Sequence, residues 1–120
     1  MMIKMFLIAS GGFFGAIARF LISEEFRKKT KHYPLATMIV NLLGSFLIGV
    51  FMSLNASEQM TFLIGLGFLG AFTTFSTFSV NVIQLYKEGR YLITLLFIVI
   101  NFVGSIGLCL IGYFLGALID

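Results

Sequence analysis

The residues best able to do chemistry lie close together, in the ten-residue stretch GAFTTFSTFS at 70–79. Within a strongly apolar segment, this stretch holds five hydroxyl side chains and three phenylalanines. Hydroxyl groups donate hydrogen bonds without carrying charge, and the rim of an aromatic ring is electropositive. Phe75 and Phe78 are three residues apart, so they lie on one face if the stretch is helical. The pattern suits a small anion that exchanges water for weak partners and then leaves.

Three more polar side chains lie in apolar surroundings and could serve the same chemistry. Asn41 and Asn101 supply neutral amide donors. Arg19 lies near the end of the first apolar segment, where its charge would raise the local concentration of anions. Structural alternatives stay open for all of these groups: the phenylalanines can face lipid, the hydroxyls can bond their own backbone, the amides can join helices and Arg19 can reach the membrane surface.

Carboxylates are missing from the apolar segments, which excludes several kinds of chemistry. Cation and proton transport usually use an acidic side chain inside the membrane, so a small proton-coupled drug exporter is disfavoured. One histidine and one cysteine, Cys109, supply neither a nucleophile–base pair nor a metal-ligand set, so we expect no enzyme. The acidic residues all lie between or beyond the apolar segments: Glu24, Glu25, Glu58, Glu88 and Asp120.

The elements that carry these groups are predicted to be transmembrane helices. The 120 residues are 59% hydrophobic and 11% charged, and a spanning helix needs about 20 apolar residues. We therefore expect an all-α integral membrane protein, with one transmembrane domain over 1–120. A net charge of +3 favours loops that face anionic lipid rather than a nucleic acid partner. The four helices are expected at about 4–23, 35–54, 60–86 and 91–118.

The third of these helices is expected to be interrupted near its middle. The segment without charged residues that contains it, 59–86, is longer than a bilayer requires. Gly65, Gly67 and Gly70 precede the hydroxyl run. Glycine, serine and threonine are weak helix formers, and broken backbone is tolerated in a membrane where it lines a site. Pairs of small residues four apart predict close helix packing: Gly11 and Gly15, Gly12 and Ala16, Ser45 and Gly49, and Gly112 and Gly116.

Four motifs resemble one family, the Fluc (CrcB) fluoride channels: GGFFGAIAR, TMIVNLLGSFLIG, GFLGAFTTFSTFS and NFVGSIGLCLIGYFLG. The resemblance implies a fluoride-selective channel in the cell membrane that lets cytoplasmic fluoride leave passively. It also implies an antiparallel dimer with two pores and a structural sodium ion at its centre.

The resemblance also implies roles for individual positions. Asn41, Phe75 and Phe78 match pore residues, and Arg19 matches the arginine of the vestibule. Gly70 and Thr73 match the break whose backbone carbonyls hold the sodium ion. Ala71 departs from the family pattern, which would have a second glycine there, and Cys109 stands where a hydroxyl is usual. Further positions on the ion pathway are Ser76, Thr77, Ser79 and Ser105.

The distribution of basic residues bears on the dimer. Loops 24–33 and 86–91 hold six lysines and arginines, whereas the opposite side has Lys4. Such a bias orients every copy alike, whereas an antiparallel homodimer needs copies in both orientations. The homodimer is favoured because the pore and sodium motifs are all present in this chain. One half of a heterodimeric fluoride channel and a non-conducting structural subunit are the alternatives.

Overall fold

The computed structural model describes residues 1–29 and 34–119, and every regular element in these ranges is helical. The chain forms four long apolar helical spans, as the apolar segments of the sequence predict. The first is α1 (Met2–Lys29), the second α2 (Leu35–Ser53) and the last α6 (Tyr91–Ile119). The third is made of several pieces between Glu58 and Lys87.

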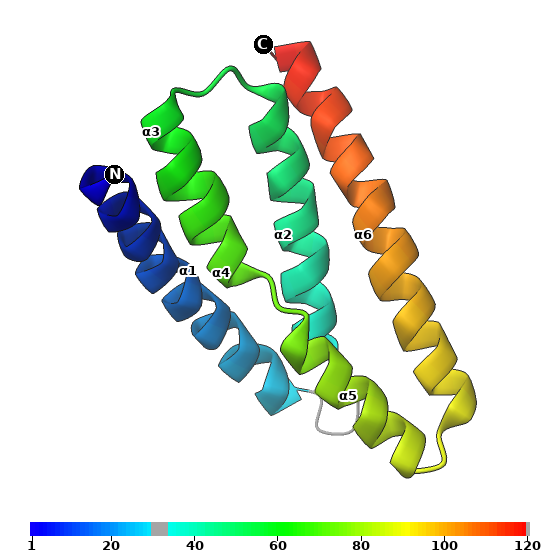
Figure 1. Cartoon of the computed structure of the whole chain (residues 1–120). Helices are drawn as coiled ribbons and strands as arrows, with labels where there is room; N and C mark the ends of the chain where they lie inside the picture. The colour runs from blue at the N-terminus through cyan, green and yellow to red at the C-terminus, as the bar shows by residue number, and fades with distance from the viewer. Residues whose placement is uncertain (30–33, 120) are drawn as a thin grey trace.

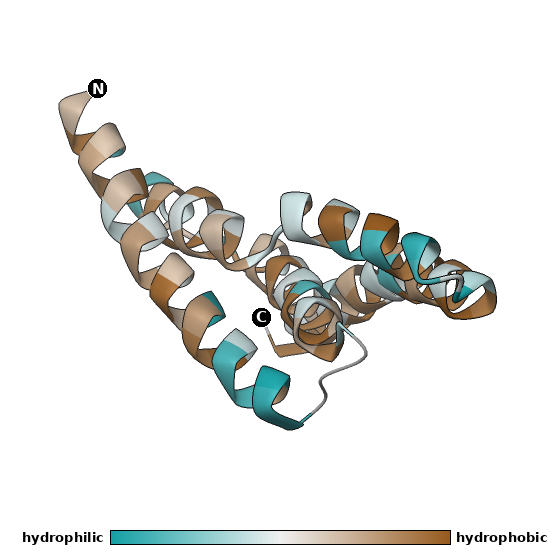
Figure 2. Ribbon diagram, turned by 90° about the horizontal axis from the view of Figure 1, so that it is seen from below, coloured by the Kyte–Doolittle hydropathy of each residue, from teal (hydrophilic) through white to brown (hydrophobic). Residues whose placement is uncertain are grey.

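Helix α1 is longer at its C-terminal end than the sequence suggested. Charged residues after position 23 read as a loop, yet the helix continues to Lys29. Arg27, Lys28 and Lys29 occupy its last turn, where positive charge is favoured by the helix dipole. Arg27 also pairs with Glu24 one turn earlier. Figure 2 shows this end of α1 as hydrophilic, in contrast to the apolar turns before it.

The third span changes helical type along its length. It starts as α3 (Glu58–Met60), continues as a π-helix, η1 (Thr61–Leu69), and ends its first part as α4 (Gly70–Phe72). Helix α5 (Ser76–Lys87) forms the second part. Between α4 and α5, Thr73 has an extended backbone with φ −82° and ψ 157°.

The spans form two packed pairs, and the third span contributes to both (Figure 1). Helix α1 packs along η1 and α4, and α2 packs along α6. After residues 73–75, α5 lies against α6 instead of α1. Successive spans run in opposite directions, so both termini lie toward one end of the bundle.

Close backbone contacts hold each pair together. A side chain at Gly11 or Gly15 would collide with the backbone of Leu63 or Phe68 in η1. On the other side, a side chain at Gly112 would collide with the carbonyl oxygen of Phe46 in α2. The small-residue pairs at 11 and 15, and at 112 and 116, therefore mark real helix contacts, as predicted.

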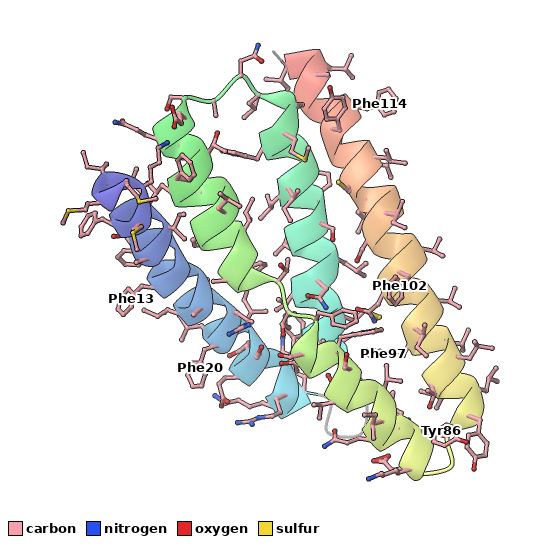
Figure 3. The ribbon with its side chains drawn as sticks, viewed as in Figure 1. Phe13, Phe20, Tyr86, Phe97, Phe102 and Phe114 are labelled. Carbon is pink, nitrogen blue, oxygen red and sulfur yellow. The ribbon has the colours of Figure 1, made fainter. Side chains whose placement is uncertain are left out.

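The outer surface is apolar, as lipid requires. Phe13 and Phe20 point away from the bundle on α1, and Phe114 does so on α6 (Figure 3). The compact core lies elsewhere, around Phe78, Leu85 and Phe97 where α5 meets α6. Lipid-facing side chains therefore surround a small aromatic core next to the connection between α4 and α5.

Candidate functional site

A cavity of about 280 Å³ lies where α2, α5 and α6 meet the connection between α4 and α5. Apolar side chains and neutral polar groups line it, and no lysine, arginine, histidine or carboxylate is among them. The cavity thus offers uncharged hydrogen-bonding groups and ring edges to anything that enters it. Its lining residues are Asn41, Ser45, Ile48, Thr73, Thr74, Phe75, Phe78, Asn101, Phe102, Ser105 and Ile106.

Two hydrogen bonds join Asn41 of α2 to the backbone of Thr74. Asn41 Nδ2 donates to the Thr74 carbonyl oxygen at 2.9 Å, and the Thr74 N–H donates to Asn41 Oδ1 at 2.8 Å. The side-chain amide therefore satisfies the backbone N–H and the backbone carbonyl oxygen of Thr74, a residue that belongs to no helix. An amide has two N–H donors, so Asn41 keeps a second one beside the cavity.

The threonine hydroxyls close the two helix ends that face this connection. Thr73 Oγ1 donates to the Leu69 carbonyl oxygen at 3.1 Å, at the end of α4. Thr74 Oγ1 accepts a bond from the Thr77 N–H at 3.2 Å, in the manner of an N-cap for α5. The hydroxyls of this sequence thus bond to nearby backbone groups, one of the alternatives left open above.

The ring of Phe78 is held firmly among other rings. It is 7% exposed and stacks on Phe97 with 5.4 Å between centroids. Phe102 approaches it edge-on, at 5.6 Å and 83°. Edge-on pairs place the positive rim of one ring against the face of the other, which fixes the orientation of Phe78 at the cavity wall.

Phe75 differs from Phe78 in its burial, although both line the cavity. Its side chain is 70% exposed, and its centroid lies 5.7 Å from that of Phe78 with a tilt of 37°. Phe75 precedes the first residue of α5. The two rings are therefore neighbours, but one is anchored in the core and the other projects from the end of a connection.

Helix α6 supplies two polar groups to the cavity, Asn101 and Ser105. Asn101 is 5% exposed, and its Nδ2 donates to the Phe97 carbonyl oxygen at 2.8 Å. Its Oδ1 is buried and accepts no hydrogen bond from the described residues. A buried acceptor without a donor costs free energy. On its α6 side the cavity therefore has an oxygen atom that a hydrogen-bond donor would stabilise.

The structure brings together some of the residues predicted from the sequence. Asn41, Phe75, Phe78, Ser105 and Thr73 all line the cavity. The remaining ones are not among the lining residues: Ser76, Thr77, Ser79, Gly70 and Arg19.

These other residues have identifiable surroundings. Ser79 Oγ donates to the Phe75 carbonyl oxygen at 3.1 Å, and Ser76 and Thr77 are exposed. Gly70 is exposed at the start of α4 and borders a second cavity of about 490 Å³ between α2 and η1. Arg19 is half-buried on α1, the helix that packs on η1 and α4.

Among the polar and aromatic residues that line the cavity, the sequence did not indicate Ser45 and Phe102 as contributors, and it gave Thr74 no role of its own within the hydroxyl run. Ser45 lies one turn after Asn41, on the same face of α2, and was assigned to packing alone. Phe102 follows Asn101 and lies three residues before Ser105, so the same reasoning could have found it. The contact between Thr74 and Asn41 could not be predicted from the sequence because Asn41 lies in another helix.

These features define a multi-pass membrane protein with an uncharged cavity among its spans, lined by apolar side chains and a few neutral polar groups. The chain belongs to the CrcB family, whose description is CrcB-like protein, Camphor Resistance (CrcB), and which matches residues 6–113. Membership confirms the resemblance seen in the sequence and assigns the chain to a family of channels rather than enzymes.

Relatives extend over nearly the whole chain. A Bacillus cereus protein named Fluoride-specific ion channel FluC 2 is 41% identical over 118 residues, covering 98% of this chain and 100% of the relative. Fluoride-specific ion channel FluC 1 of Geobacillus kaustophilus is 38% identical over 109 residues, covering 91% and 94%. Fluoride-specific ion channel FluC of Ruminiclostridium cellulolyticum is 40% identical over 124 residues, covering 98% and 92%.

Proposed function

We propose that this protein is a fluoride-selective channel of the cell membrane through which cytoplasmic fluoride leaves passively. One observation carries the proposal: the cavity beside Asn41 is lined by neutral polar groups and phenylalanine rings, without any ionisable side chain. The names of the relatives supply the identity of the ion.

The lining accounts for passage of a small anion in physical terms. Amide, hydroxyl and ring-edge contacts each attract fluoride weakly, so they can replace its water one partner at a time. A fixed positive charge in the cavity would hold the ion too long for rapid transfer. The membrane potential, negative inside, drives an anion outward by about 2.3 kcal/mol per 100 mV, and no nucleotide or proton coupling is needed.

The pathway is proposed to include the residues that line the cavity and the hydroxyl run beside it. Asn41, Phe75 and Phe78 are its central members, and Ser105 continues it on α6. Ser76, Thr77 and Ser79 extend it along α5, and Arg19 serves the vestibule. Since α1 does not border the cavity, the role of Arg19 in this proposal is to attract anions over a distance.

The channel is proposed to act as an antiparallel dimer with two pores. Gly70 is exposed at the start of α4, and Thr73, directly after α4, has an extended backbone. Backbone carbonyls of these two residues would hold a structural sodium ion at the dimer centre. Backbone carbonyl oxygens suit a hard monovalent cation. The fit is supported by the Thr74 N–H, which donates to Asn41 Oδ1 instead of to the Gly70 carbonyl oxygen four residues earlier.

The partner in the dimer is proposed to be a second copy of this chain. A heterodimer is a second candidate because basic residues gather at one end of the bundle (Figure 1), which would orient every copy alike. They lie in the last turns of α1 and α5 or just after α5: Arg27, Lys28, Lys29, Lys87 and Arg90. Lys31 in the first loop lies outside the described residues. Fluoride efflux from cells or vesicles that contain this chain alone would select the homodimer.

A liposome experiment tests the channel itself. Purified protein is reconstituted in vesicles loaded with potassium fluoride, and a fluoride electrode records release after valinomycin is added. Rapid release of fluoride without comparable release of chloride is the expected result. Equal leakage of both ions, or release of neither, would exclude a fluoride-selective channel.

A further inference from the structure

We propose that Thr74 is a positioning residue that sets the place of the Phe75 ring. It is held through its backbone by Asn41, and its hydroxyl in turn holds the start of α5. The inference rests on the proposed function only where it concerns flux, because the arrangement itself can be measured without fluoride.

The need for such a residue follows from the exposure of Phe75. Within a single chain, a ring that is 70% exposed has few neighbours to restrain it, and each freely rotating backbone residue carries a large conformational entropy. Phe78, by contrast, is fixed by Phe97 and Phe102. Of the two rings at the cavity, Phe75 is therefore the one whose position must come from the backbone.

The bonds of Asn41 act on the peptide group that carries Phe75. The Thr74 carbonyl oxygen, which accepts from Asn41 Nδ2 at 2.9 Å, belongs to the planar unit that ends at the Phe75 Cα atom. The second bond, from the Thr74 N–H to Asn41 Oδ1 at 2.8 Å, fixes the preceding peptide group. Together they hold both peptide planes around Thr74 relative to α2.

The hydroxyl of Thr74 joins this fixed point to α5. Thr74 Oγ1 accepts from the Thr77 N–H at 3.2 Å, and the Ser76 hydroxyl lies 3.4 Å from it. A bond of this kind satisfies a backbone N–H group in the first turn of a helix and stabilises its start. Thr74 therefore sets the spacing between Phe75 and the first turn that leads to Phe78.

Threonine suits both tasks, and its close analogues separate them. The branched Cβ atom restricts the rotamers of the side chain and so helps to hold its hydroxyl in place. Valine has the same shape without the hydroxyl, whereas serine has the hydroxyl without the branch. Thr74→Val therefore removes the cap and keeps the volume, and Thr74→Ser keeps the cap.

The test reads the Phe75 ring directly. One 4-fluorophenylalanine is placed at position 75, or at the control position 114, in full-length protein in lipid nanodiscs, and ¹⁹F NMR spectra are recorded without fluoride. Thr74→Val is expected to shift and broaden the signal at 75, with the signal at 114 unchanged. Thr74→Ser is expected to restore the wild-type signal at 75.

Further variants keep the outcome decisive. Asn41→Asp replaces the donor to the Thr74 carbonyl oxygen with a second acceptor, so it should move the same signal even if Thr74→Val fails to fold. In liposomes, loss of the cap should reduce flux roughly fivefold. An unchanged signal at 75 in folded Thr74→Val or Asn41→Asp overturns the proposal, as does an equal shift at 114.

The two proposals can fail separately. If wild-type protein releases no fluoride but the signal at 75 follows Thr74, the channel function fails and the positioning role stands. If wild-type protein releases fluoride but the ¹⁹F signal at position 75 is the same in wild type and Thr74→Val, the positioning role alone fails.

Discussion

Thr37 in the first turn of α2 donates a hydrogen bond from Oγ1 to Asn81 Oδ1 in α5, across a distance of 2.7 Å. Thr37 is 7% exposed, so water competes little for this bond. It joins α2 to α5 beyond the buried ring of Phe78 and fastens the second part of the third span to the helix that carries Asn41.

Thr37→Val should therefore lower the stability of the folded protein. Hydrogen bonds between membrane helices contribute on average about 0.6 kcal/mol, and Asn81 Oδ1 would lose its donor. Thermal unfolding in detergent should show a lower midpoint for Thr37→Val, with Thr37→Ser close to wild type. Equal midpoints for all three proteins would show that this bond adds nothing to stability.

Phe78→Ile should reduce fluoride flux by roughly tenfold, since an aromatic contact is worth about 0.5–1.5 kcal/mol beyond its buried area. Isoleucine fills part of the space but presents no electropositive rim to an ion. Phe75→Ala should also slow the flux. The measurement is initial efflux from liposomes at equal protein content.

Phe114→Ile is the matched control, because this ring is 68% exposed on α6 and does not line the cavity. Its flux should equal that of wild type. If Phe78→Ile conducts as well as Phe114→Ile, ring edges take no part in ion transfer, even in a functioning channel.

Gly112→Ala should destabilise the pair of α2 and α6. The added methyl group would collide with the Phe46 carbonyl oxygen, and overpacking typically costs about 1–3 kcal/mol. Gly107→Ala on the same helix meets nothing within 4 Å in the described chain, so it should keep or raise the unfolding temperature, since alanine favours helix. A larger loss from Gly107→Ala than from Gly112→Ala would contradict this helix contact.

Removal of sodium should abolish flux if Gly70 and Thr73 hold a structural ion. The ion would neutralise carbonyl dipoles that face each other across the dimer, and without it these dipoles repel. Efflux is compared after prolonged dialysis of protein against sodium or N-methylglucamine buffers, followed by restoration of sodium. Full activity after exhaustive dialysis would contradict a structural sodium site.

Flux of the fluoride ion should not vary steeply between about pH 6.5 and 8.5. The residues that line the cavity contain no group that titrates in this range. The measurement is efflux at several pH values, with protein-free vesicles subtracted to remove leakage of the neutral acid. A sigmoidal change with pH would show that a titratable group controls the pathway.

The sequence predicted the spans well because the signal is local. Apolar segments of about 20 residues identify a spanning helix wherever it packs; three of these segments carry no charged residue and the first carries Arg19, and all four spans were confirmed. Pairs such as Gly112 and Gly116 were recognisable because close helix contact in lipid requires small residues. The extension of α1 to Lys29 was missed because a helix can continue beyond the membrane, where charged side chains are favourable.

The cavity was harder to predict because its parts come from different helices. Hydroxyls and rings at 73–79 were recognisable as a group, yet their partners depend on packing. Asn41 is 33 residues from Thr74. Only the fold shows that the Asn41 side-chain amide forms hydrogen bonds with the backbone of Thr74. The π-helical turns of η1 also had no local sequence signal, since their residues suit an α-helix equally well.

Because the third span leaves α1 for α6 at residues 73–75, it belongs to both helix pairs, and α2 also contacts α1 between them. A small rotation of one helix pair against the other would therefore change the width of the cavity beside the connection between α4 and α5, while every helix kept its length.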